Sequence, residues 1–257
     1  MKPPPGGLAV PLLVSALLLS SCDAFFSTNL FQKAGLGQQK TPSASTLASM
    51  SVSDLKSLAE SPSFYSDLSS DSAKKTAVLD NLSGVFTPPA SGGAATVQEA
   101  AALYAQVELN TTAAAEIVSD VLPAAMSSDY STLNASNIVA FIKASLPADV
   151  LADSSGAKFE AAINAILAAR LAYDALSSSI SSGANTLSTA EIGDAAQGAI
   201  LAYAVDGITM TGGVGDKAKD LWTLVNGGPG VSIQSFSPNV AIANVILNAA
   251  GSPFTFS

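Results

Sequence analysis

The sequence predicts an all-α protein, either a multi-helix bundle or a solenoid-like array of helical hairpins. Apolar residues recur at helical spacing in one segment after another. Clusters of proline, glycine and serine separate these segments and predict short loops. Strand-like alternation is convincing only in Val231–Phe236. Because a single strand has no partner for its backbone groups, we expect an extended loop there.

The first half of the chain contains five predicted helices, several with a start or stop signal. Ser51 or Ser53 is expected to cap the first, and Pro62 limits it. Thr96 and Glu99 have the spacing of a capping box and predict the start of the third. The predicted ranges are 53–58, 72–85, 96–107, 112–126 with a kink or end at Pro123, and 138–146 with Asn134 or Ser136 as its cap.

The second half contains the longest predicted helix and three others. Residues 157–180 carry a broad apolar stripe that includes Phe159, Ile163 and Ile166. Ser188 and Glu191 form a second capping-box pattern, which predicts a helix that runs to residue 205. A short helix over 217–225 contains Trp222, and a final one over 238–249 is expected to stop at Gly251.

Three of these helices contain a similar short sequence that ends in tyrosine, at Tyr104, Tyr173 and Tyr203. The first two tyrosines are 69 residues apart, and the next is 30 further on. The first spacing is about two periods of roughly 34 residues, so residues 96–208 weakly resemble a tetratricopeptide-like repeat. The tryptophan, glycine and proline positions of that motif are not matched. Bundle and array therefore both stay open.

The N-terminus has the layout of a secretory signal. Met1 and Lys2 precede an apolar run over 8–19, which ends in Leu19-Ser20-Ser21-Cys22. This ending resembles the lipobox of bacterial lipoproteins. The resemblance implies that cleavage follows Ser21 and that the thiol of Cys22 is acylated.

The lipobox resemblance also implies a domain organisation. Residues 1–21 would be a cleaved signal peptide, 22–47 a lipidated N-terminus and tether, and 48–257 a single helical domain. The apolar run is shorter than the roughly 20 residues that a membrane-spanning helix needs. Acyl chains would therefore hold the protein on a membrane of the bacterial envelope, facing the periplasm or the outside. Phe25, Phe26 and Phe31 lie in the tether and are expected to contact the interface or the domain.

Composition excludes several kinds of chemistry. The chain has no histidine and a single cysteine, so triads with histidine and cysteine-ligated zinc sites are excluded. A net charge of -9 repels phosphate backbones and excludes nucleic acid as a partner. We expect no cofactor, no metal and no enzymatic activity. A hydrolase that uses two carboxylates is a third-ranked alternative.

The expected function is binding, as a scaffold for a protein partner in the envelope. The alternative is an acidic small ligand held in a cleft by Arg170, Tyr173 and Tyr203, because a guanidinium matches a carboxylate or phosphate. Arg170 could instead pair with Asp174, one helical turn away. The loop over 211–217 has glycines before a helix but not the order of a phosphate-binding loop, so we interpret it as a flexible connection.

Overall fold

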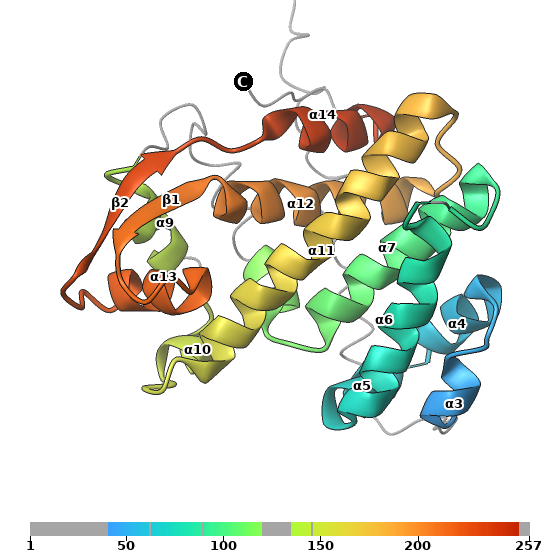
Figure 1. The fold of residues 1–257 in the computed structure, drawn as a ribbon, viewed down its shortest axis with the longest axis horizontal. Coiled ribbons are helices and arrows are strands. Elements are labelled where there is room, and N and C mark those ends of the chain that lie inside the picture. The colour runs from blue at the N-terminus through green and yellow to red at the C-terminus, as the bar shows by residue number, and fades with distance from the viewer. Residues whose placement is uncertain (1–40, 62, 89, 120–134, 145, 252–257) are drawn as a thin grey trace, which may run out of the picture.

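Helices dominate the structure, as the sequence predicts, and a small two-stranded sheet lies at one end (Figure 1). This computed structural model describes residues 41–251, apart from 62, 89, 120–134 and 145. The predicted signal peptide, Cys22 and the phenylalanines of the tether lie outside the described residues, as do Pro123 and Asn134. Residues 114–119 are helical and belong to the helix predicted over 112–126.

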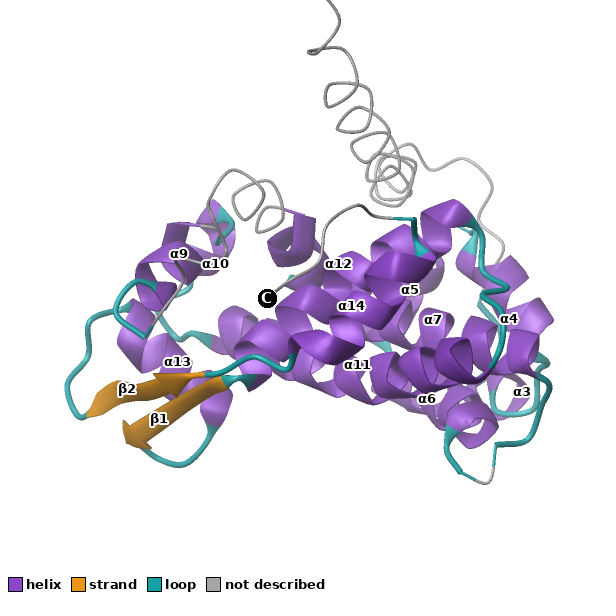
Figure 2. Cartoon of the chain, turned by 90° about the horizontal axis from the view of Figure 1, so that it is seen from above, coloured by secondary structure: helices purple, strands orange, loops and turns teal. Residues whose placement is uncertain are grey.

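The N-terminal helices lie at the end of the molecule opposite the sheet (Figure 2). Ser51 caps the second of them, because its hydroxyl accepts a hydrogen bond from the backbone of Asp54. Two of the four were not predicted, and one of these lies within the predicted tether, where Leu47 is fully buried. The four are α3 (Ala44–Leu47), α4 (Val52–Ala59), α5 (Phe64–Ser70) and α6 (Ser72–Phe86).

Helix α7 (Ala94–Asn110) begins three residues earlier than the capping-box pattern predicts. Gly93 is its N-cap, so the predicted cap at Thr96 is wrong. Glu99 instead lies near the ammonium of Lys56 on α4, 3.5 Å away. The same type of pattern is confirmed at the start of α12 (Thr189–Asp206), where the side chains of Ser188 and Glu191 each accept from the other's backbone.

A long central helix, α11 (Ala157–Ser182), organises the fold. It packs against α12, which follows it in the chain, and also against α7 and α14 (Val240–Ala249), which are far from it in the sequence (Figure 1). In a solenoid, each repeat contacts only its neighbours along the chain. The arrangement is therefore that of a bundle around α11.

Small side chains allow these central helices to approach closely. Buried alanines occupy the facing positions of α7, α11 and α12, as the alanine-rich composition predicts. Gln98 of α7 is fully buried and ties α7 to the end of α11. Its amide nitrogen donates to the carbonyl of Ala184, and its amide oxygen accepts from the backbone and hydroxyl of Thr186. All polar atoms of this amide side chain therefore have partners.

The second end of the molecule contains the sheet and three short helices (Figure 2). Lys217–Val225 forms α13 as predicted, with the side chain of Asp216 as its cap. Trp222 packs on Phe159 of α11, with 5.3 Å between the ring centroids. The other two helices are α9 (Ile138–Ala144) and α10 (Ala148–Leu151).

The prediction of an extended loop over Val231–Phe236 is wrong. This segment is strand β2, and it pairs antiparallel with β1 (Ile208–Gly212). The pairing has an irregularity between Thr209 and Met210. The strand β1 is too short and too rich in glycine at its end to show a pattern of its own, and the pairing with β2 comes from tertiary structure.

Candidate functional site

Arg170 lies near the surface on α11 and forms an ion pair with Asp206, the last residue of α12. The predicted pairing with Asp174 is not observed. Asp174 instead accepts a hydrogen bond from the hydroxyl of Tyr203, at 2.5 Å. Burial, followed by this hydrogen bond, raises the pKa of the Tyr203 hydroxyl. The tyrosine is therefore a neutral hydrogen-bond donor.

Lys217 completes this cluster from the start of α13. Its ammonium donates to the backbone carbonyl of Asp206 at 2.6 Å, where a cation stabilises the C-terminus of α12. Burial lowers the pKa of Lys217, and the charge of Asp206 partly opposes this. The two cations and two carboxylates of the cluster compensate each other. Arg170 and Tyr203 thus join α11 to the end of α12.

Tyr173, the third predicted ligand residue, belongs to a different site. Its side chain is 1% exposed and reaches Gly198 of α12, so close that a methyl group on Gly198 would overlap the phenol oxygen. Burial raises the pKa of this hydroxyl, with a smaller contribution from the charge of Asp194. The structure therefore brings Arg170 and Tyr203 together but places Tyr173 apart from them.

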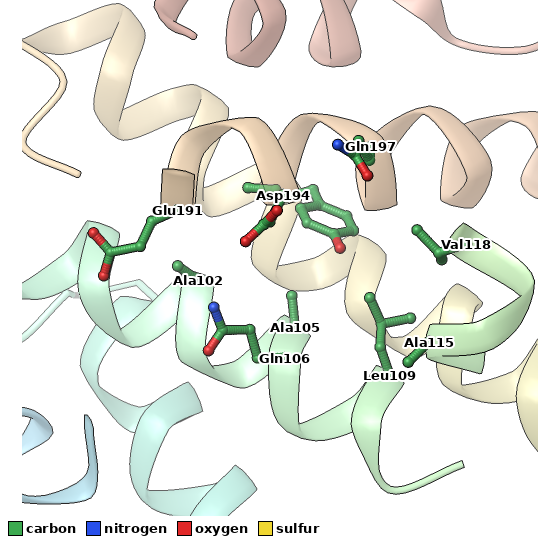
Figure 3. A pocket seen from close by; sticks show the side chains of 11 residues that line it. Ala102, Ala105, Gln106, Leu109, Ala115, Val118, Glu191, Asp194 and Gln197 are labelled. Atoms are coloured by element: carbon green, nitrogen blue, oxygen red, sulfur yellow. The ribbon is translucent and has the colours of Figure 1, made fainter. Parts of the chain in front are cut away.

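A partly enclosed cavity of about 20 Å³ lies beside Tyr173, between α7, α11, α12 and residues 114–119. Figure 3 shows the carboxylate of Asp194 on α12 and the amide of Gln106 on α7 facing this space. A volume of this size holds a single water molecule and no organic ligand. Glu191 and Gln197 also line it, and the rest of the wall is apolar: Ala102, Ala105, Leu109, Ala115, Val118 and Ala195.

Asp194 is the unusual group at this cavity. Its Oδ1 atom is buried and has no hydrogen-bond partner among the described residues. Burial, and to a smaller degree the charge of Glu191, raises the pKa of Asp194 to about 7. Neither Asp194 nor Gln106 was predicted as a site residue. The only sequence signal was an acid that interrupts an otherwise apolar helix between Ile192 and Ala195.

In the glycine loop before α13, the carboxylate of Asp220 occupies the position that a bound phosphate would take. Asp220 is 4% exposed, and it accepts hydrogen bonds from the backbone of Val214 at 2.9 Å and of Gly215 at 3.2 Å. These amides are the groups that a phosphate would need. The interpretation of 211–217 as a connection is therefore supported, but the loop is held by Asp220.

An open hollow of about 630 Å³ lies on the surface between α3 and α6. It adjoins a second hollow of about 450 Å³ at the start of α6, because Ser72 lines both. Asp80 lines the first hollow, and Asp67 and Asp71 line the second. Among the described residues, Lys74 is the one ammonium that lines either hollow. We call the first hollow the α6 trough. Its lining residues are Ala48, Ser72, Ala73, Thr76, Ala77, Asp80 and Asn81.

Replacing Arg170 with alanine is expected to lower the free energy of unfolding by about 1 kcal/mol or less, because the ion pair with Asp206 is partly exposed. Chemical denaturation measures the change. Arg170→Lys, which keeps the charge, is the control and should recover part of the loss. A loss of several kcal/mol would contradict the assignment of Arg170 to a half-exposed pair.

Among the described residues, no group of three histidine, cysteine, aspartate or glutamate side chains could hold a metal ion. None of the described helices combines the length and apolar character needed to cross a bilayer. In comparisons with protein-family models, curated proteins and solved structures, no match to this chain was found.

Proposed function

We propose that the protein is a lipid-anchored, non-enzymatic binding module of the bacterial cell envelope, with a protein as its partner. The anchor is inferred from the lipobox-like ending at Cys22. The binding surface is inferred from the α6 trough, which is the observation that carries this proposal. Its small alanine, serine and threonine side chains let a partner's backbone approach closely.

The charge around the trough favours a basic segment of the partner. In the part of the chain that the structure describes, three carboxylates and one ammonium line the two adjoining hollows. Lys74 is engaged with the backbone carbonyl of Thr41, at 3.3 Å, and Asp71 caps α6. Asp80 is exposed at the edge of the trough. Electrostatic complementarity of this kind increases the association rate and the selectivity for a partner.

The alternative, an acidic small ligand near Arg170, has less support. Arg170 is paired with Asp206, and Tyr203 already donates to Asp174. A ligand carboxylate would have to displace Asp206 and would leave that charge without its partner. The cavity beside Tyr173 is too small for such a ligand.

Site-specific photo-crosslinking in the native cells tests the protein partner. A photoreactive residue in place of Thr76, which is exposed in the trough, is expected to give one discrete adduct of higher mass. The same residue in place of Lys219, which is exposed on α13, is the matched control and should give none. Adding Ala73→Trp to the Thr76 variant should fill the trough and abolish the adduct. No adduct at Thr76, or the same adduct at both positions, would refute this surface.

Two further measurements separate the parts of the proposal. Metabolic labelling with an alkyne fatty acid should mark the wild type, and Cys22→Ala should lose both the label and membrane attachment. Labelling that survives the substitution would refute the anchor. Native mass spectrometry tests the ligand alternative, because a small mass that is lost on denaturation would favour it over a protein partner.

A further inference from the structure

The cavity beside Asp194 has no role in the proposed binding function. Its walls come from three helices and residues 114–119, and most of them are apolar. The buried Oδ1 atom of Asp194 has no hydrogen-bond partner among the described residues. The space next to it accommodates one water molecule, which cannot replace the hydration of a charged carboxylate in bulk water.

The nearest charges do not stabilise an ionised Asp194. Glu191 lies one turn earlier on α12 and is negative. Burial alone would raise the pKa of Glu191, but hydrogen bonds from Lys56 and Ser188 offset this and lower it. Lys56 contacts Glu191 at 2.6 Å and Glu99 at 3.5 Å, so its charge is already shared between two carboxylates.

Among the described residues, the other elements that line the cavity add no cation. Helix α11 contributes the neutral hydroxyl of Tyr173. Helix α7 contributes the amide of Gln106, which accepts from the hydroxyl of Tyr65 on α5 at 3.3 Å. Glu116, on residues 114–119, is exposed. Helix α14 and strand β1, which also pack on α12, contain no titratable residue.

We propose that Asp194 is a proton-binding site that makes the packing of α12 against α7 sensitive to pH near neutrality. In the protonated form, the carboxyl is neutral and gains an O–H donor within a wall that contains amide oxygens. In the ionised form, a charge faces a mostly apolar cavity and the negative Glu191. Loss of the proton therefore weakens the contact between the two helices.

The direction of the pH dependence follows from the raised pKa. In the folded protein it is about 7, whereas the ordinary value is 3.8, so the folded state holds the proton more tightly than the unfolded state. This stability is fully present below about pH 4 and is lost as the pH rises to about 7. Within this window, the unfolding equilibrium constant should rise up to about tenfold per pH unit from this group.

Denaturation of the full chain in detergent between pH 5 and pH 8.5 tests this site. The wild type is expected to lose stability as the pH rises to neutrality, and Asp194→Asn should flatten that loss and be the more stable form at pH 8. Glu116→Gln removes an exposed carboxyl on residues 114–119 and should leave the wild-type slope unchanged. If Asp194→Asn retains the wild-type slope, the proposal is wrong.

A second measurement does not depend on the folding of a variant. Titration of the wild-type side-chain carboxyl carbons by NMR should show one aspartate with an apparent pKa near 7, assigned to Asp194. A normal titration of Asp194 near pH 4 would overturn the proposal. The crosslinking result at Thr76 has no bearing on either outcome, because the trough lies on α3 and α6.

Discussion

Replacing Gly198 with alanine is expected to lower the free energy of unfolding by about 3 kcal/mol. The added Cβ atom would lie 1.9 Å from the phenol oxygen of Tyr173 and 2.9 Å from its Cζ atom. Tyr173 is 1% exposed, and the cavity of about 20 Å³ beside it is too small to take up the displaced ring. Thermal and urea denaturation measure the change.

A glycine in a helix with open space around it should respond in the opposite way, because replacing it with alanine raises the free energy of unfolding. Gly84 is exposed in α6, and a Cβ atom there would have nothing within 4 Å. Gly84→Ala is therefore the matched control and should stabilise the protein by roughly 0.5–1 kcal/mol. Adding Tyr173→Phe to Gly198→Ala removes the overlapping oxygen and should recover part of the loss. Equal effects at Gly84 and Gly198 would contradict the observed packing of α11 on α12.

Replacing Gly156 with alanine is expected to lower the free energy of unfolding by about 2–4 kcal/mol. Gly156 caps α11 with φ of +75°, a conformation that side chains rarely adopt. The added Cβ atom would also lie 2.3 Å from Nε1 of Trp222. Displacement of this indole would disturb its contact with Phe159 and the packing of α13 on α11.

Fluorescence gives a direct reading of this change, because Trp222 is the single tryptophan of the chain. We expect the emission of Gly156→Ala to shift to longer wavelength as the indole gains solvent. Gly215→Ala is the matched control, since Gly215 has φ of +78° but no atom within 4 Å of the added Cβ. It should cost only the conformational strain, about 1–2 kcal/mol, and leave the emission unchanged. If both variants lose the same stability, the steric contribution of Trp222 is absent.

The helices could be predicted wherever their signals are local. Ser188 and Glu191 form their capping box within one turn, and Gly251 follows the last helix with φ of +70°. Apolar spacing located α11 and α13 to within two residues. The capping pattern at Thr96 failed because Gly93 begins α7 earlier and Glu99 lies near Lys56. A local signal therefore holds only where no tertiary contact competes for the same side chain.

The candidate sites could be predicted only in part, because partners were distant in the chain. Arg170 was recognised as an unusual residue, yet its partner, Asp206, is on another helix. The hydrogen bond from Tyr203 to Asp174 likewise joins two different helices. Asp194 gave almost no signal, since an acid in an amphipathic helix is usually solvated. Its burial depends on how α7 and α11 pack against α12.

The sequence by itself determined the all-α class and most helix boundaries, because these depend on residues that are close along the chain. Tertiary structure alone decided the arrangement around α11, the pairing of β1 with β2 and the environment of Asp194. Each of these depends on which faces meet across long sequence separations. Helical periodicity identifies a buried face but does not specify the surface that covers it.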